Sequence, residues 1–178
     1  MADFRLLING RWLIVGLLAI AVPLRASSGA DVADAARARD IAAVRALLKQ
    51  GADVNGAQGD GMTALHWAAT NGDAALTQML LSAGANIRAT TRLGGITPLL
   101  MASQAGHAQV VATLLAAGAD ANSMTATGAT ALMLAARSGS TETVTRLVET
   151  GADINAKEKG FGQTALMVAA GLDRADVV

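Results

Sequence analysis

The feature that most constrains this chain of 178 residues is a short sequence that recurs at almost constant intervals. Its clearest copy is Thr97-Pro98-Leu99-Leu100-Met101-Ala102. Related copies place four threonines 34, 33 and 34 residues apart, at Thr63, Thr97, Thr130 and Thr164. A second marker, Gly-Ala-Asp or Gly-Ala-Asn, recurs in phase at Gly51, Gly84, Gly118 and Gly151. Two markers with one period predict an array of stacked structural repeats.

Each marker also predicts a local structure. A threonine hydroxyl can accept a free N–H group at the start of a helix, and Pro98 suits the first helical position because no donor is needed there. Nine residues after the first three threonines stand Gly72, Gly106 and Gly139, where a left-handed residue would end a short helix. The second marker glycine follows twelve residues later and would end a second helix. The repeat is therefore helix, tight turn, helix, and an extended loop.

This pattern resembles the ankyrin repeat, whose signature includes Thr-Pro-Leu-His, Gly-His and Gly-Ala-Asp followed by Val-Asn. The stretches that carry the resemblance best are 106–122 and 51–55. The resemblance implies an all-α solenoid of helix-turn-helix units with β-hairpin-like finger loops. Its repeats would cover about 31–60, 61–94, 95–127, 128–161 and a truncated 162–178. Of the four motif positions, only His66 keeps the histidine, so a Thr–His side-chain network is expected in the second repeat alone.

The two terminal repeats depart from the pattern. The first lacks the threonine and its loop, and Arg39 takes the position of the turn glycine, as expected for a capping repeat with one polar side. In the last repeat Asp173 takes the glycine position, and the chain ends before the apolar pair that would bury a second helix. We therefore expect a truncated array, or a fragment of a longer one, whose last repeat is its least stable part.

Apolar residues at i, i+4 spacing on the second helices predict the buried face of the array. We expect them and three methionines to form core rather than a cofactor site, with Trp67 assigned to the core less firmly. They are Leu76, Leu80, Leu81, Val110, Val111, Leu114, Leu115, Val144, Leu147, Val148, Met79, Met101 and Met133.

Residues 1–30 lie outside the repeats and have the anatomy of a secretory signal peptide. Arg5 and Arg11 precede an apolar run from Trp12 to Leu24, which is shorter than the roughly 18 to 20 residues that span a bilayer. Small residues follow, with cleavage expected after Ala26 or Ala30. The prediction is an exported, periplasmic or secreted protein, as in exported bacterial-type ankyrin repeat proteins. The alternative is an uncleaved membrane anchor at 12–24, the one case in which membrane contact is expected.

The sequence offers little chemistry. It has no cysteine, no phosphate-binding loop, no His-Glu-x-x-His and no Gly-x-Ser-x-Gly motif. His66 and His107 occupy repeat positions that suit structural roles. The recurring aspartates Asp53, Asp120 and Asp153 suit turn hydrogen bonds better than a metal site. The formal net charge is zero, so no nucleic-acid partner is expected. We expect no catalytic residues, no cofactor, no metal, no small-molecule substrate and a monomeric protein.

In the ankyrin family the finger loops and the solvent side of the first helices form a concave surface that binds protein partners. Carried over by position, the partner-binding residues would be Gln58, Asp60, Met62, Arg92, Leu93, Ile96, Thr125, Thr127, Lys159, Phe161 and Gln163 on the fingers, with Thr70, Asn71, Gln104 and Arg137 on the helices. Leu93 and Phe161 would either contact a partner or pack against their own hairpin, and the sequence leaves both possibilities open. Ile96 directly precedes a helix cap, which favours packing.

The resemblance therefore implies a non-enzymatic protein–protein interaction module. One alternative is that the array is the N-terminal scaffold of a larger protein whose functional domain lies beyond Val178. An enzyme would need an acid–base pair in a pocket, and the sequence shows none.

Overall fold

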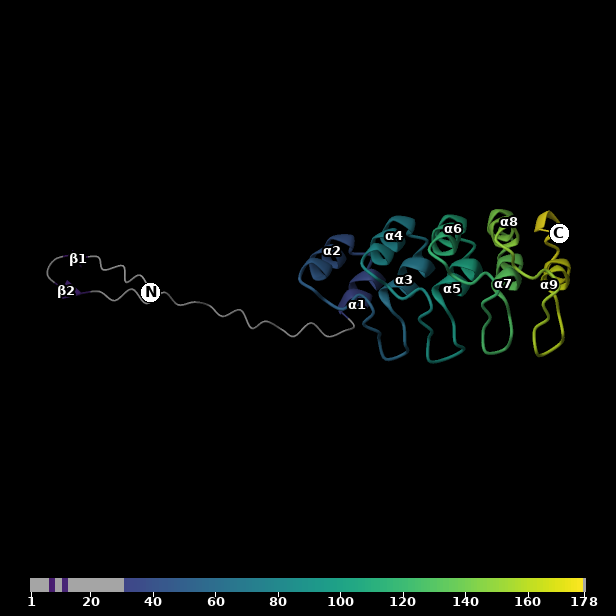
Figure 1. Cartoon of the computed structure of the whole chain (residues 1–178), viewed down its shortest axis with the longest axis horizontal. Helices are drawn as coiled ribbons and strands as arrows, with labels where there is room; N and C mark the ends of the chain where they lie inside the picture. Colours follow the sequence, from purple (N-terminus) through teal and green to yellow (C-terminus); the bar gives the residue numbers. More distant parts are fainter. Residues whose placement is uncertain (1–6, 9–10, 13–30, 178) are drawn as a thin grey trace.

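The computed structural model describes residues 7–8, 11–12 and 31–177, and residues 31–177 form an array of helix pairs (Figure 1). The signal-peptide prediction falls almost wholly outside the described residues and stays a prediction. Within that segment, two short antiparallel strands, β1 (Leu7–Ile8) and β2 (Arg11–Trp12), are described. None of the helices among the described residues is both long and apolar enough to span a bilayer.

The array is all-α, as predicted. Its first helices are α1 (Asp31–Arg37), α3 (Ala64–Asn71), α5 (Pro98–Ala105), α7 (Ala131–Ser138) and α9 (Ala165–Gly171). Its second helices are α2 (Ile41–Lys49), α4 (Ala74–Ser82), α6 (Ala108–Ala116) and α8 (Thr141–Glu149), and the last repeat has the 3-10 turn η1 (Ala175–Val177) in that place.

The repeat markers begin and end these helices as the sequence predicts. The hydroxyls of Thr97, Thr130 and Thr164 accept a hydrogen bond from the backbone N–H of the third helical residue, at 3.3 to 3.4 Å. At the other end, Gly72, Gly106 and Gly139 cap α3, α5 and α7 with φ between 72° and 77°. These short-range signals explain why the two-helix unit recurs with so little change.

Two residues other than glycine occupy the same turn position. Arg39 has φ 60° and Asp173 has φ 53°, and they are the positive-φ residues other than glycine in the described part of the chain. Each stands where the period places a turn glycine. The geometry of the turn is therefore set by the repeat and is imposed even on a residue with a Cβ atom, at a cost in backbone strain.

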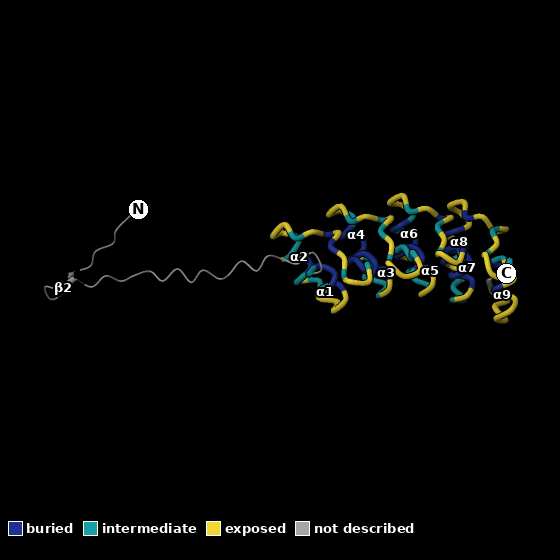
Figure 2. Tube along the Cα trace, turned by 90° about the horizontal axis from the view of Figure 1, so that it is seen from below, coloured by how far each residue is buried: buried dark blue, intermediate teal, exposed yellow. Residues whose placement is uncertain are grey.

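The helices form two layers. First helices contact first helices along the whole array, from α1 to α9, and α4, α6 and α8 form the second layer. The tube in Figure 2 shows burial concentrated where the helices pack and exposure at the loops. The largest fully buried side chains are mainly leucines at the repeated positions, including Leu65, Leu80, Leu99, Leu114 and Leu147. This confirms the predicted core for most of its members.

Val148 is the exception, because the repeat pattern predicts it as core and its side chain is 44% exposed. Its counterparts, Leu81 on α4 and Leu115 on α6, are partly buried against the core, and each of these helices contacts the second helix of the next repeat. After α8 that place holds only η1, which is too short to cover the same surface. Ile154 and Leu166, 56% exposed each, are uncovered at the same end.

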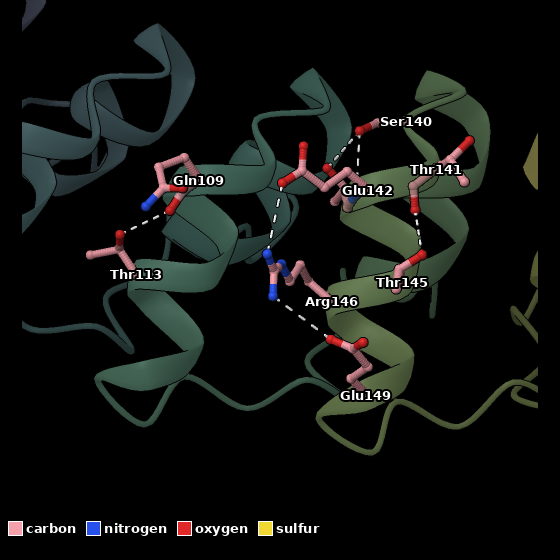
Figure 3. A network of polar contacts seen from close by, with 9 residues as sticks. Gln109, Thr113, Ser140, Thr141, Glu142, Thr145, Arg146 and Glu149 are labelled. Atoms are coloured by element: carbon pink, nitrogen blue, oxygen red, sulfur yellow. Dashed lines mark hydrogen bonds and ion pairs between the residues drawn. The ribbon is translucent and has the colours of Figure 1, made fainter.

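The outer face of α8 carries exposed, paired charges (Figure 3). Arg146 lies 3.9 Å from Glu142 and 3.8 Å from Glu149, with all three side chains at least half exposed. Thr145 donates to the carbonyl of Thr141, one turn back on the same helix. Exposed pairs of this kind contribute little, about 0 to 1 kcal/mol. This face of the second layer is therefore exposed to solvent, and its charged groups are paired within α8.

Candidate protein-binding surface

Four finger loops project from the first helices, and each closes on itself through a backbone hydrogen bond. The closing bonds run from Gln58 N–H to Met62 C=O, from Thr91 N–H to Ile96 C=O, from Thr125 N–H to Ala129 C=O, and from Glu158 N–H to Gln163 C=O, at 2.8 to 3.1 Å. We call the loops 58–62, 91–96, 125–129 and 158–163 the first to fourth fingers. The surface formed by these fingers and the adjacent side of the first helices is called the finger face below.

Neighbouring fingers are also joined to one another. The backbone N–H groups of Arg92, Ala126 and Lys159 donate to the carbonyls of Asp60, Gly94 and Thr127, at 2.8 to 3.0 Å. The fingers therefore form one connected row rather than four independent loops. Because the loops are already ordered, binding of a partner would cost less conformational entropy.

The N-terminal half of the finger face uses its polar side chains internally. Gln58 donates through Nε2 to Asp34 at 2.5 Å and accepts at Oε1 from the indole N–H of Trp67 at 2.9 Å. The guanidinium of Arg37 lies 5.3 Å from the centre of the Trp67 ring. Asn71 donates to the carbonyl of Ala36 at 3.3 Å. These contacts join α1, the first finger and α3.

Thr70 and Thr125, both predicted to contact a partner, likewise have internal hydrogen bonds. The Thr70 hydroxyl lies 2.9 Å from the carbonyl of His66 and 3.2 Å from the sulfur of Met101. The Thr125 hydroxyl bonds to the Thr127 hydroxyl at 2.9 Å. Their polar groups stabilise the scaffold, so their availability for a partner is reduced.

Met62, which the sequence predicts as a contact residue, is only 7% exposed and therefore offers little surface to a partner. It is the last residue of the first finger and directly precedes Thr63, the cap of α3. The same place in the second finger belongs to Ile96, which packs against the core, as its position before a helix cap predicts. An apolar residue just before the cap therefore turns inward.

The C-terminal half of the finger face is more open. Leu93 is 83% exposed and Phe161 is 91% exposed, so neither packs against its own hairpin. Six other predicted residues of this half are exposed: Arg92, Gln104, Thr127, Arg137, Lys159 and Gln163. Among them, the Thr127 hydroxyl is bonded to that of Thr125, and Lys159 reaches the carbonyl of Ala126 at 3.3 Å. Asp60 is exposed too, but it belongs to the first finger and accepts from the Met62 N–H. Within the described residues, no hydrogen bond or ion pair engages the side chains of Arg92, Gln104, Arg137 and Gln163.

Two adjoining hollows open between the third and fourth fingers and the helices α7 and α9. One has a volume of about 250 Å³ and is lined by residues that include Thr127, Leu134, Arg137 and Phe161. The other has a volume of about 330 Å³ and includes Met167 and Leu172 in its lining. Arg137, Gln163 and Val168 line both. We call this pair of hollows the C-terminal groove.

Glu158, at the base of the fourth finger, has its carboxylate directed at backbone N–H groups. It accepts from Gly160 and Phe161 at 2.5 Å and from Gln163 at 3.2 Å. Hydrogen bonds from the N–H of Gly160, Gln163 and Phe161 lower the pKa of Glu158 below its ordinary value. The carboxylate therefore stays ionised near neutral pH and organises the finger that carries Phe161.

Both histidines have structural partners. His66 is fully buried, with Nδ1 2.9 Å from the Thr63 hydroxyl and Nε2 3.0 Å from the carbonyl of Ile96. Burial of the ring lowers its pKa, because the charged form loses its hydration. His107 Nε2 lies 3.1 Å from the carbonyl of Thr70. The predicted Thr–His network in the second repeat is confirmed, and both rings join neighbouring repeats.

The described residues contain no group of three or more His, Cys, Asp or Glu side chains that could hold a metal ion. The surface instead presents a connected row of fingers and an apolar groove beside an arginine. Such an arrangement suits recognition of another molecule.

Sequence reasoning missed part of the groove. Val168, Met167 and Leu172 line it, and none of them was a predicted contact. A signal existed, because Trp67, Met101, Leu134 and Val168 all stand four residues after a repeat threonine. Two of these residues, Leu134 and Val168, line the hollow beside the fourth finger. Comparing that one offset across the repeats would have found both.

Comparison with known proteins supports the same architecture. A family model described as "Ankyrin repeats (3 copies)" matches residues 32–125, 74–158 and 99–178. The chain is 41% identical over 71 residues to "Ankyrin repeat and LEM domain-containing protein 1 homolog" of Caenorhabditis elegans, a match covering 40% of this chain and 9% of that protein. It is 39% identical over 79 residues to "Mitochondrial disaggregase" of Bos taurus, covering 43% of this chain and 12% of that protein.

Both matches span only about a tenth of these relatives, so they concern the repeats and not the activity of either whole protein. The family model, by contrast, matches nearly all of the array. With its helix pairs, left-handed turns and finger loops, the chain belongs to the ankyrin repeat family.

Proposed function

We propose that this chain is a non-enzymatic module that binds a protein partner through the finger face, mainly with its C-terminal half. Ankyrin repeats are generally protein–protein interaction modules, and the family match extends over almost the whole array. The observation that carries the choice of face is the exposure of Phe161, 91%, on a finger held by backbone hydrogen bonds. A large apolar side chain that stays in water is typical of an interface.

The outer layer is the natural control surface. Arg146 on α8 is exposed like Arg137 on α7, but it already has two carboxylate neighbours. Ile154 is exposed like Phe161 but lies outside the fingers. These residues allow each test variant on the finger face to be matched by a variant of similar chemistry elsewhere.

A photo-reactive amino acid placed at position 161, and in a second sample at position 146, tests the proposal in cells that make the protein. We expect a discrete cross-linked species from position 161 that is absent from position 146. Phe161→Ala and Arg137→Ala should weaken capture of that same species, whereas Ile154→Ala and Arg146→Ala should not. Equal cross-linking from both positions, or cross-linking from 146 alone, would contradict the choice of the finger face.

We also propose that the protein is exported, on the basis of its positively charged and then apolar N-terminal segment. The intact mass of the protein recovered from each cell fraction tests this proposal. A periplasmic or secreted form beginning at Ser27 or Asp31 is expected, and a cell-retained form beginning at Met1 would indicate an anchor. A mass extending beyond Val178 would support the alternative that the array is the front part of a larger protein.

A further inference from the structure

The C-terminal groove has the size and lining of a site for one large side chain of a partner. Its two hollows measure about 250 and 330 Å³. The smaller hollow lies below, and the larger at the low end of, the roughly 300 to 1,000 Å³ found for pockets that enclose small ligands. Phe161 lines one hollow while it is 91% exposed, and the buried Val168 lines both hollows. An apolar side chain inserted here would cover the ring and be covered by it.

The charges around this groove are mostly positive. Arg137 lines both hollows, and Lys157 and Lys159 are exposed beside and on the fourth finger. Among the described residues, the ion pairs are those of Arg146 with Glu142 and Glu149 on the outer layer (Figure 3). Arg137 therefore meets the groove without a carboxylate partner.

The acidic residues of this half differ in how far they are engaged. Asp120 and Asp153 each accept a backbone N–H two residues ahead, in the loops that follow α6 and α8. Asp173 directly follows Leu172, a lining residue of the groove, and Asp176 lies in η1. Glu158 lines the hollow beside the fourth finger, but its two oxygens accept three N–H groups of its own finger. The groove is thus apolar, and among the described residues Arg137 is the charged lining residue that has no hydrogen bond or ion pair.

Resting on the proposed function, we infer that the C-terminal groove binds an extended acidic peptide segment of the protein partner. One large apolar side chain of this segment enters the groove beside Phe161, and a neighbouring aspartate or glutamate pairs with Arg137. The row of fingers, joined through Thr127 and Lys159, supports the segment along its length. The unpaired positive charge of Arg137 favours an acidic segment, and the apolar hollow favours a large apolar side chain in that segment.

Selection of random displayed peptides on the full chain tests this inference, and it requires no identified partner. The recovered peptides should combine a Leu, Ile, Phe or Trp with a nearby Asp or Glu, and Phe161→Ala should abolish their binding. For a synthetic copy, Arg137→Gln should weaken binding roughly tenfold. Replacing the peptide carboxylate by its amide should cause a similar loss of affinity. The amide peptide should bind the Arg137→Gln variant little more weakly than it binds the parent chain. Arg146→Gln is the matched control and should change nothing.

Each other outcome overturns a defined part of the inference. Peptides that need Phe161 but lack acidic residues, and that ignore Arg137→Gln, would overturn the acidic partner and leave the finger face as the binding surface. Peptides indifferent to both variants, or the absence of any peptide that depends on Phe161, would overturn the inference and count against the proposed function. Equally tight binding of random single-stranded RNA, lost with Arg137→Gln, would assign the groove to nucleic acid instead.

Discussion

The two halves of the finger face come from the same kind of repeat, but their side chains are engaged differently. In the N-terminal half, Gln58 is joined both to Trp67 and to Asp34 of the first repeat. In the C-terminal half, Phe161 and Gln163 of the fourth finger are exposed. Lying on a finger therefore does not by itself leave a side chain free. What decides its role is whether a neighbouring element supplies a partner for the side chain.

The same difference explains why apolar exposure gathers at one end. Val148, Ile154, Phe161, Leu166, Met167 and Leu172 are all more than two-fifths exposed. The first repeat, in contrast, places polar contacts against its neighbour and leaves arginines exposed. One end of the array is closed by its own polar contacts, and the other leaves apolar side chains exposed.

The largest expected difference in stability is between alanine variants of Trp67 and Phe161. Trp67→Ala should lower the free energy of unfolding by about 2 to 3 kcal/mol, below the cost for a fully buried tryptophan because the ring is only partly buried. Phe161→Ala should change it by less than about 0.5 kcal/mol. Urea unfolding followed by circular dichroism measures both. A similar loss for Phe161→Ala would mean that this ring packs within the fold.

A smaller effect is expected for the two finger glutamines. Gln58→Ala removes hydrogen bonds to Asp34 and Trp67 and should cost about 1 kcal/mol, since water can replace part of what is lost. Gln163→Ala should leave the free energy of unfolding unchanged within about 0.5 kcal/mol. Thermal melts of the two variants beside the parent chain make the comparison. Equal destabilisation would remove the distinction between the two halves.

The pH dependence of stability tests the buried contact between the second and third repeats. Because burial lowers the pKa of His66, the unfolded state takes up a proton more readily than the folded state. The stability contribution is complete above the unfolded value of 6.5 and is lost as the pH falls toward the folded pKa. Glu158, whose pKa is lowered from 4.5, would affect the pH dependence of stability only at lower pH.

Free energies of unfolding should therefore fall between about pH 7 and pH 5 in the parent chain. His66→Met, which copies the residue at the same position of the fourth repeat, should flatten that slope while lowering stability at neutral pH. An unchanged slope in the variant would assign the pH dependence to other groups.

The smallest expected effect concerns the strained turn of the first repeat. Arg39→Gly should raise the free energy of unfolding by about 0.5 to 1 kcal/mol, since the left-handed conformation costs a residue with a Cβ atom more than it costs glycine. Asp173→Gly should raise the free energy of unfolding by less, because aspartate tolerates the left-handed conformation better than arginine does. Gly106→Ala is the opposing control and should destabilise. A loss of stability in Arg39→Gly would show that the arginine side chain matters more than the turn.

Much of the fold was predictable because its signals are local. The threonine caps, the glycine turns and the period each act within one repeat, so they are readable without tertiary structure. The exposure of Val148 was not predictable from its own helix, since it depends on what the following repeat places over it. The burial of Met62 likewise depends on the packing beside the cap of α3.

The candidate site was predictable only in part, for the same reason. The family resemblance indicated the fingers, and most of the named residues are indeed exposed there. Whether a named residue is free depends on contacts across repeats, such as that between Asn71 and Ala36, 35 positions apart. No pattern within one repeat reports such a pairing.

By itself the sequence determined the repeat, its helices and the turns that its glycines mark. These features follow from interactions between residues close together in the chain, repeated with one period. Only the tertiary structure decided which half of the finger face is closed and which is open. That division arises from side chains of different repeats meeting in space, where Trp67 finds Gln58 and Arg37 while Phe161 remains in water.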